Sequence, residues 1–210
     1  MDKKIIARGA EAILYREKLD GQEVLVKERI KKSYRLPEID SELRSQRTRR
    51  EARLLSEARR CGVDTPKVFS VDESGCKIIM EFIKGKMLKV LFNDASEKDA
   101  AIMAEKTGGQ IALLHSGGII HGDLTTSNMI LSEGKIYFID FGLGEVSQRV
   151  EDFATDLSVL KEAIKSTHFR RLEVLWKSVE KGYKSSNPNA EAVFRRMDAI
   201  EKRGRYSKRD

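Results

Sequence analysis

Two polar motifs, separated by a short apolar pattern, constrain this chain more than any other part of it. The first motif reads His-Gly-Asp-Leu-Thr-Thr-Ser-Asn at residues 121–128, and the second reads Asp-Phe-Gly at residues 140–142. The apolar runs 129–131 and 136–139 predict two strands, joined by a Glu-Gly turn at residues 133–134. Because a hairpin fixes the separation of the two motifs, the pair is a far stronger signal than either motif alone.

The polar residues of these motifs are the types that phosphoryl transfer requires. Asp123 can orient a hydroxyl group or a water molecule and accept its proton. Asn128 and Asp140 offer the hard oxygen atoms that hold Mg²⁺ against nucleotide phosphates. We therefore predict a nucleotide and magnesium site in which Asp123 is the catalytic base.

Such a site also needs a cation for the α- and β-phosphates, and that cation needs a carboxylate to hold it. Lys27 lies on the expected strand 24–28; its alternative reading is a solvent-facing lysine on an edge strand. On the expected helix 41–60, Glu51 shares a face with apolar residues three, four and seven positions later. It therefore points to the interior, where an unpaired charge is unfavourable, and we prefer it to Glu57 as the partner of the lysine.

The other nucleotide contacts are predicted from weaker signals. Gly9 and Ala10 are candidates for a loop that covers the phosphates, although the segment has one glycine where a protein kinase has a G-x-G-x-x-G run. Taken alone, an ordinary hairpin turn explains this segment nearly as well. Glu81 and Ile83 are expected to present backbone groups to an adenine, with Met80 behind it.

The apolar patterns predict a strand-rich first part and a helical second part. Strands are expected at residues 5–7, 12–16, 24–30, 68–71 and 77–83. Helices are expected at residues 41–60 with Asp40 or Ser41 as N-cap, 99–114, 153–164, 172–179 and from 188 onward. Trp176 falls in the apolar stripe of its helix, so we expect it in the core. Together these elements predict an α+β, two-lobed, protein-kinase-like fold with lobes at 1–83 and 84–210.

The charge of the chain predicts a polyanionic partner, and its apolar pattern excludes a membrane-spanning protein. The formal charge is +7, and no apolar run approaches the roughly 20 residues of a membrane span. Two isolated cysteines and the absence of a signal sequence lead us to expect a reducing, cytoplasmic setting. The cations that we expect to contact nucleic acid fall in three clusters: Lys27, Arg29, Lys31, Lys32 and Arg35; Arg44, Arg47, Arg49, Arg50, Arg53, Arg59 and Arg60; and Lys202, Arg203, Arg205, Lys208 and Arg209. For any one cluster, a solvated helix face is an equal alternative.

The chain resembles the small, atypical PRPK-type kinases of the KEOPS (EKC) complex over nearly its whole length. The segments that carry the resemblance are residues 30–37, 47–55 and 121–128, the pair Asp156-Leu157, and a tail with Arg203-Gly204-Arg205. The resemblance implies a two-lobed kinase fold, use of ATP and Mg²⁺, and serine/threonine autophosphorylation or ATP hydrolysis. It further implies support of threonylcarbamoyladenosine formation on transfer RNA. The partners that it implies are the threonylcarbamoyl transferase subunit, a small regulatory subunit and transfer RNA.

Three features depart from the usual kinase or family pattern. Gly122 stands where most protein kinases have an arginine that pairs with a phosphorylated activation loop, so we expect no such switch. No Ala-Pro-Glu motif follows Gly142, and only residues 143–152 precede the next expected helix, which leaves little platform for a substrate peptide. Phe153 occupies a position where the family is expected to have a polar residue.

Two other functions fit parts of the sequence. A small-molecule phosphotransferase of the aminoglycoside or choline kinase type also carries His-Gly-Asp, but such chains have a larger second lobe for the acceptor. A catalytically silent RNA-binding scaffold would fit the charge. Such a scaffold has no chemical need to retain the four residues Lys27, Asp123, Asn128 and Asp140.

Overall fold

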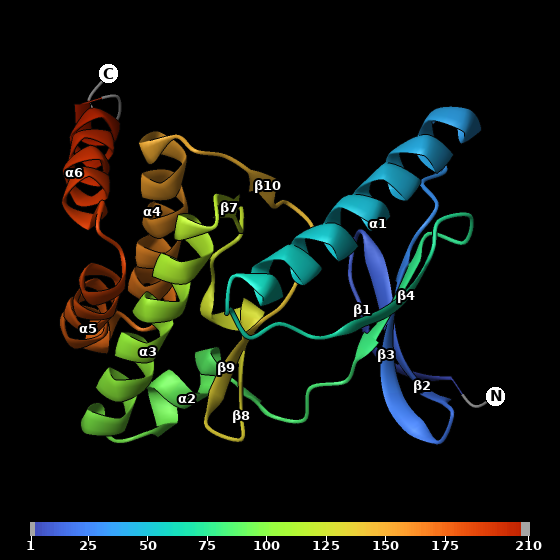
Figure 1. Cartoon of the computed structure of the whole chain (residues 1–210), viewed down its shortest axis with the longest axis horizontal. Coiled ribbons are helices and arrows are strands. Elements are labelled where there is room, and N and C mark those ends of the chain that lie inside the picture. The colour runs from blue at the N-terminus through green and yellow to red at the C-terminus, as the bar shows by residue number, and fades with distance from the viewer. Residues whose placement is uncertain (1–2, 207–210) are drawn as a thin grey trace.

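The computed structural model describes residues 3–206, for the last three of which only the backbone is described. Figure 1 shows a twisted sheet at one side, helices at the other side, and helix α1 running diagonally between them. The sheet is antiparallel with the order β1-β2-β3-β5-β4 and consists of Lys4–Arg8 (β1), Ala12–Leu19 (β2), Gln22–Arg29 (β3), Val68–Asp72 (β4) and Lys77–Glu81 (β5). The predicted strands of the first part are therefore confirmed.

The hairpin of β2 and β3 forms where the sequence predicts it. Asp20 and Gly21 both have positive φ, at 48° and 82°. A two-residue hairpin turn with this backbone matches the twist of the flanking strands, and Asp-Gly is one of the pairs that tolerate it. The turn sets the register in which Lys27 pairs with Leu14 on β2 and with Ile78 on β5.

Helix α1 spans Pro37–Arg60 and begins earlier than expected. The predicted N-cap role of Asp40 or Ser41 is wrong, because the helix begins at Pro37, which needs no N–H partner at this position. The Asp40 side chain is fully buried, and its carboxylate accepts hydrogen bonds from the Lys32 backbone N–H at 3.3 Å and from Arg44 Nε at 2.7 Å. A tertiary role therefore replaces the expected cap.

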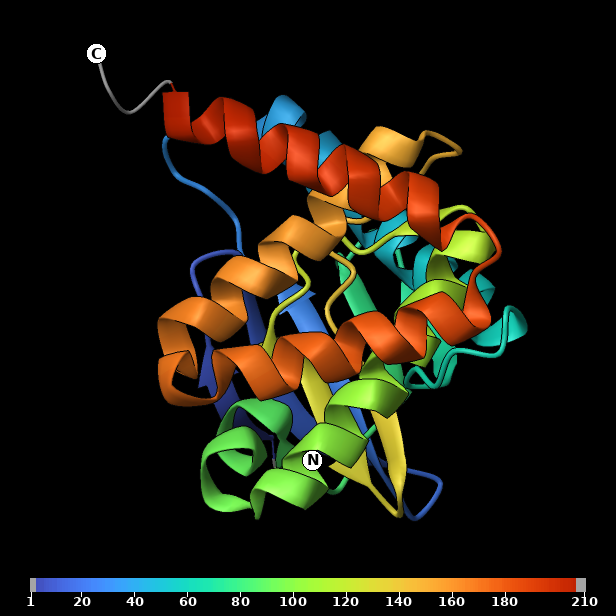
Figure 2. The same cartoon turned by 90° about the vertical axis from the view of Figure 1, so that its left-hand side faces the viewer.

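Within residues 3–206, five further α-helices follow the sheet, and Figure 2 shows α4, α5 and α6 packed across the helical side. The helices are Leu88–Asp94 (α2), Glu97–Ser116 (α3), Val150–Thr167 (α4), Leu172–Ser186 (α5) and Ala190–Tyr206 (α6). Helix α2 was not predicted, while α3 and α4 are longer than expected. The segment after Arg203 was expected to lack regular structure, but α6 continues to Tyr206; Lys208 and Arg209 lie outside the described residues.

Helices α3 and α5 approach each other closely at two glycines. A Cβ atom on Gly108 would lie 2.0 Å from the carbonyl oxygen of Val179, and one on Gly182 would lie 1.9 Å from that of Glu105. No side chain fits at either position, so the two helix backbones are in direct contact. Trp176 on α5 is buried, as its apolar stripe predicts.

The two motifs flank a small hairpin, as expected. Its strands are Met129–Ser132 (β8) and Lys135–Phe138 (β9), and Lys86–Met87 (β6) pairs with the free side of β8. A second, unpredicted pair joins Ile119–Ile120 (β7) to Glu145–Val146 (β10). This pair holds the chain that follows Gly142 against the chain that enters the first motif.

The main hydrophobic core continues across the predicted junction between the lobes. It contains Leu54 and Leu55 of α1 and Ile78 of β5, together with Leu124 and Phe141 from the two motifs. A separate small cluster lies on the other face of the sheet around Tyr15. No helix among residues 3–206 combines the length and the apolarity needed to cross a membrane.

Candidate active site

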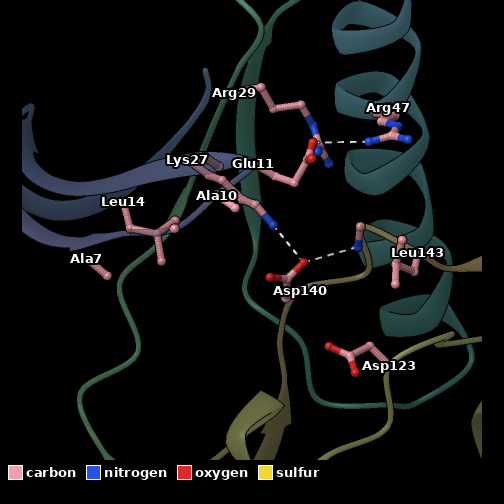
Figure 3. A pocket seen from close by; sticks show the side chains of 13 residues that line it. Ala7, Ala10, Glu11, Leu14, Lys27, Arg29, Arg47, Asp123, Asp140 and Leu143 are labelled. Atoms are coloured by element: carbon pink, nitrogen blue, oxygen red, sulfur yellow. Dashed lines mark hydrogen bonds and ion pairs between the residues drawn. The ribbon is translucent and has the colours of Figure 1, made fainter. Parts of the chain in front are cut away.

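A cavity of about 380 Å³ lies between the sheet and the two motifs (Figure 3). Its walls come from the β1–β2 turn, from β3, from α1 and from both motifs. They are formed by Ala7, Gly9, Ala10, Glu11, Ala12, Leu14, Lys27, Arg29, Arg47, Asp123, Asp140, Gly142 and Leu143. The cavity thus brings together Lys27 of β3 with Asp123 and Asp140 of the two motifs, about a hundred positions later in the sequence.

Lys27 is held by the carboxylate that the helix pattern singles out. Lys27 Nζ donates to Glu51 Oε1 at 2.6 Å, and the Glu51 side chain is 1% exposed. Glu57, the competing residue, is half-buried and pairs with Arg53 at 3.7 Å. The second oxygen of Glu51 accepts from Arg29 at 2.5 Å, so one buried carboxylate binds two buried cations.

Arg29 was not expected in this site. The sequence places it in a basic cluster for nucleic acid, but its side chain is 6% exposed and faces Glu51. The available signal was its position two residues after Lys27 on the same strand, because alternate residues of a strand lie on one face. Lys27 and Arg29 are therefore removed from the predicted nucleic-acid surface.

Asp140 joins the same set of charges from the second motif. Lys27 Nζ donates to Asp140 Oδ1 at 2.7 Å, and the Gly142 N–H donates to the same oxygen at 3.2 Å. Burial alone would lower the pKa of Lys27, but the carboxylates of Glu51 and Asp140 outweigh burial and raise it. Burial likewise disfavours the Asp140 carboxylate, yet Lys27 holds the pKa of Asp140 below its usual range. Both groups are therefore charged at neutral pH.

The first motif arranges Asp123 and Asn128 through its own hydrogen bonds. Asn128 Nδ2 donates to the Asp123 backbone carbonyl at 2.9 Å and to Asp123 Oδ2 at 2.8 Å. The amide nitrogen of Asn128 is thus occupied, which leaves its oxygen as the atom that can bind a cation. Asp140 has half of its side-chain surface exposed, so its carboxylate is also accessible.

His121 connects the two motifs from inside the protein. Its Nε2 lies 3.0 Å from the Ile139 carbonyl, and its Nδ1 lies 3.3 Å from the Asp123 backbone nitrogen. A neutral ring with its proton on Nε2 satisfies both contacts, since Nδ1 then accepts the Asp123 N–H. Complete burial lowers the pKa of His121 and favours this neutral form.

Asp156 of α4 anchors the backbone of the first motif. Its two oxygens accept the N–H groups of His121 at 2.8 Å and of Gly122 at 3.0 Å. The carboxylate is buried and also lies 3.2 Å from His115 Nε2. The resemblance points to Asp156, but no pattern in the sequence shows that it binds a loop 35 residues earlier. Phe153, one turn earlier on α4, stacks on the ring of His115 at 4.9 Å.

The conformation of Gly122 explains why an arginine is not found there. Its φ is +79°, which residues with a side chain rarely adopt. A Cβ atom would also lie 2.3 Å from the carbonyl oxygen of Leu143. The chain after Gly142 therefore packs so closely against this position that only glycine fits, and an arginine is excluded along with every other side chain.

The predicted phosphate-covering loop lines the cavity and is held by backbone and side-chain contacts within the protein. The Gly9 N–H donates to the Ala12 carbonyl at 2.9 Å, so it is already used. The ammonium group of Lys32 donates to the Ala10 carbonyl. At the tip of the turn, Glu11 Oε2 lies 3.1 Å from Arg47 of α1.

The residues predicted to contact adenine do not line this cavity. Met80 is buried on β5, and Glu81 uses its backbone N–H to bind the Lys67 carbonyl at 2.8 Å. Any backbone contact between Glu81 and a ligand would therefore use its carbonyl oxygen. For Met80, Glu81 and Ile83 the adenine contact stays a prediction.

Many of the cations predicted to contact nucleic acid bind acidic or carbonyl groups of this chain. The pairs on α1 are Arg44 with Asp40, Arg47 with Glu11, Arg49 with Glu73, Arg53 with Glu57, and Arg59 with the Thr65 carbonyl. Lys31, Arg50 and Arg60 are exposed. The surface for a polyanion is therefore sparser than the count of basic residues suggests.

Comparison with known proteins identifies the fold that holds this cavity. The pattern of the RIO domain matches residues 16–175, a segment that includes Lys27, Glu51 and both motifs. This chain belongs to the RIO family of atypical kinases. The two-lobed, kinase-like α+β fold predicted from the sequence is thereby confirmed.

This RIO-family chain is similar over almost its whole length to proteins named for the KEOPS complex or for threonylcarbamoyladenosine biosynthesis on transfer RNA. It is 45% identical to the "KEOPS complex subunit Bud32" of Pyrococcus abyssi, over 98% of the chain and 97% of that protein. It is also 45% identical to a "probable bifunctional tRNA threonylcarbamoyladenosine biosynthesis protein" of Methanosarcina mazei and to one of Methanothermobacter thermautotrophicus. In these two matches the chain is covered over 97% of its length but spans 36% of the relative. The resemblance to the KEOPS kinases is therefore confirmed.

Proposed function

We propose that this chain is an ATP- and Mg²⁺-dependent kinase or ATPase subunit that supports formation of threonylcarbamoyladenosine on transfer RNA. One observation carries the proposal. A cavity that joins Lys27, Asp123 and Asp140 lies in a chain that matches a KEOPS subunit over 97% of that subunit's length.

In this proposal the charges of the cavity bind the nucleotide. Lys27 binds the α- and β-phosphates, and Glu51 keeps Lys27 in place. Because Arg29 also binds Glu51, the carboxylate stays fixed when the lysine ammonium turns toward a phosphate. The turn at Gly9 and Ala10 covers the phosphates, with the Ala10 N–H as the candidate donor because the Gly9 N–H binds the Ala12 carbonyl, while Met80, Glu81 and Ile83 are the proposed adenine contacts.

The oxygen atoms near the second motif suit a magnesium ion. Asp140 has an accessible carboxylate, and Asn128 has its amide nitrogen occupied by Asp123, so both offer oxygen toward a cation. A bound Mg²⁺ would neutralise phosphate charge there. Asp140 would then exchange its contact with Lys27 for the ion, which frees the lysine for the phosphates.

Asp123 is the proposed catalytic base. A hydroxyl or water oxygen attacks the terminal phosphorus, the bond to the bridging oxygen of ADP breaks, and the Asp123 carboxylate takes the proton of the attacking group. The hydrogen bond from Asn128 to Asp123 Oδ2 sets the direction of the carboxylate. The backbone anchor at Asp156 keeps the loop that carries Asp123 in position.

The acceptor is either a serine or threonine hydroxyl or a water molecule, and we favour water. Residues 143–149 are all that separates the second motif from α4, and part of them forms the two-residue strand β10. A small platform favours a small acceptor. The same compactness argues against an aminoglycoside- or choline-kinase-type function, and the charged cavity argues against a silent scaffold.

We further propose the partners named by the resemblance: the threonylcarbamoyl transferase subunit, a small regulatory subunit and transfer RNA, in the cytoplasm. The exposed cations Lys31, Arg50, Arg60, Lys202 and Arg203 are the proposed RNA contacts, and Arg205, Lys208 and Arg209, whose side chains lie outside the described part of the chain, complete the proposed surface. The nucleotide binds between the proposed lobes 1–83 and 84–210. Replacing exposed cations should weaken RNA binding and flatten its dependence on salt. An unchanged salt slope would remove them from the RNA surface.

Turnover of radiolabelled ATP by the purified chain tests the proposal. The chain is assayed alone, with the transferase subunit, and with the transferase and transfer RNA together. Free phosphate that increases with both partners supports the ATPase reading, while label on protein serine or threonine supports a kinase. An absence of turnover in all three mixtures would contradict the proposal, provided that the complex forms.

A further inference from the structure

The cavity contains a second, partly exposed cation to which the function proposed above gives no role. Arg47 lies on α1 one turn before Glu51 and lines the same cavity as Lys27. Its NH1 atom lies 3.1 Å from Glu11 Oε2, and 35% of the Arg47 side chain is exposed. Arg29 pairs with its carboxylate in the interior, with 6% of its side chain exposed, whereas Arg47 pairs with Glu11 at the rim, where solvent and ligands can compete for it.

Figure 3 shows where this arginine lies along the cavity. Ala7 and Leu14 occupy one end, Arg47 lies at the other, and Lys27 and Asp140 lie between them. Apolar side chains suit a base, and Lys27 suits the α- and β-phosphates. A nucleotide laid out in this order extends its terminal phosphate toward Arg47.

Glu11 makes the arrangement unusual for a phosphate-binding site. Its carboxylate lies on the turn that covers the cavity, and a free negative charge there would repel a polyphosphate. Arg47 neutralises it at present, and Lys32 lies 3.9 Å from its other oxygen. A guanidinium group binds carboxylate and phosphate oxygens with similar geometry. The Glu11 carboxylate therefore takes the place at the Arg47 guanidinium that a phosphate group could take.

We propose that Arg47 is a ligand of the terminal phosphate of a nucleoside triphosphate, and that Glu11 holds it until the nucleotide displaces the carboxylate. Lys32, which also binds the Ala10 carbonyl, then remains as the cation beside Glu11. The inference rests on the proposed nucleotide site and adds selectivity for triphosphates over diphosphates to it. Arg47 thereby supplies a contact that a diphosphate cannot make.

The competing explanation is a purely structural ion pair that ties the loop to α1. The two explanations predict different changes in nucleotide affinity when Arg47 and Glu11 are replaced in turn. If the pair only ties the loop, Arg47→Gln and Glu11→Gln should weaken nucleotide binding alike. If Arg47 binds phosphate, Arg47→Gln weakens it, whereas Glu11→Gln strengthens it because the competitor and its charge are removed.

Calorimetric titration of the full chain with a non-hydrolysable ATP analogue and with ADP, both with Mg²⁺, tests the proposal. Arg47→Gln should lower the affinity for the triphosphate analogue by about tenfold, equivalent to ~1.4 kcal/mol, and the affinity for ADP by less than about twofold. Glu11→Gln should raise the affinity for the analogue. Arg53→Gln is the matched control, because it removes an exposed charge from α1 outside the cavity.

A charge swap gives an independent test. The double variant Glu11→Arg with Arg47→Glu recreates the ion pair but places a carboxylate at the proposed phosphate site. We expect it to bind the triphosphate analogue at least as weakly as Arg47→Gln; restored binding would overturn the proposal. Equal losses of analogue and ADP on Arg47→Gln, or weaker binding by Glu11→Gln, would also overturn it. A wild-type chain that binds neither nucleotide would instead contradict the proposed function, and this inference with it.

Discussion

Lys27 and Asp140 are 113 positions apart in the sequence, yet Lys27 Nζ lies 2.7 Å from Asp140 Oδ1. The contact joins the sheet to the second motif across the cavity that both residues line. Both groups are in their charged forms, because each shifts the pKa of the other in the direction that favours charge. The charges proposed to bind the nucleotide are thus held together by contacts within the chain itself.

Replacing either aspartate of the motifs should remove activity without unfolding the chain. Asp123→Ala and Asp140→Ala should each lower ATP turnover by at least about 10²-fold, since one loses the proposed base and the other a proposed metal ligand. Both residues lie on the cavity wall and Asp140 is half exposed, so the circular dichroism spectrum should be unchanged. Wild-type-like turnover by folded Asp140→Ala would remove Asp140 from the mechanism.

Loss of the Glu51 charge should be strongly destabilising. Glu51→Gln leaves Arg29 and Lys27 buried without their shared carboxylate, which we expect to lower the free energy of unfolding by about 3 kcal/mol. Glu57→Gln is the control, because this half-buried carboxylate pairs only loosely with Arg53, at 3.7 Å. Urea denaturation of the two variants measures the difference. Equal stability of both would show that the buried pair contributes little.

The two positive-φ glycines Gly122, in the first motif, and Gly134, in the β8–β9 turn, should respond differently to replacement by alanine. Their φ values are nearly equal, at +79° and +78°. Backbone strain should therefore lower the free energy of unfolding of both Gly122→Ala and Gly134→Ala by about 1–2 kcal/mol. Only at Gly122 does the added Cβ meet the backbone, at 2.3 Å from the Leu143 carbonyl oxygen, whereas nothing lies within 4 Å of it at Gly134. Gly122→Ala should therefore unfold at a clearly lower temperature and lose turnover. Equal melting temperatures would contradict the close approach.

The chain should lose stability as the pH falls below about 6.5, the usual pKa of histidine. Burial lowers the pKa of His121 and of His168 in the folded state, so the unfolded chain binds protons that the folded chain does not. The stability should be constant above this pH and should decrease by at most about 1.4 kcal/mol per pH unit per histidine below it.

Melting curves across this range test the expectation. His168→Gln is the informative variant, because a glutamine amide offers one donor and one acceptor, as the neutral ring does toward Asn93 and Thr126, and does not titrate. It should reduce the slope without abolishing it, since His121 remains. Carboxylates such as Asp140, whose pKa is lowered, contribute only at more acidic pH. An unchanged slope would exclude His168 as a source.

The parts of the fold that were predictable depend on local chemistry. The Asp20-Gly21 and Glu133-Gly134 turns need positive φ at both residues, and that requirement is visible in the residue types. Glu51 was chosen over Glu57 by helical periodicity alone, and it is the one that contacts Lys27. In each case the deciding neighbours lie within one turn or one strand.

The parts that were not predictable depend on which partner a polar side chain meets in the folded chain. Asp40 has the residue type of an N-cap, but its carboxylate binds Lys32 and Arg44 inside the protein. Arg29 has the residue type of a surface cation, but its guanidinium group is buried and donates a hydrogen bond to Glu51. Asp156 gives no local signal that it binds the loop at His121. Tertiary contacts decided these three roles, and residue type alone does not reveal such contacts.

The glycine contact between α3 and α5 has a consequence for how this chain can change over evolution. Gly108 and Gly182 each face the backbone of the other helix, so even the methyl group of alanine would force the helices apart. Neither residue lines the cavity, and neither is a candidate for chemistry. A library of all single substitutions should nevertheless reject changes at both sites as strictly as at Asp123. If both positions are glycine in related chains as well, the reason would be the lack of space for any side chain between the two helices, and not a role in catalysis.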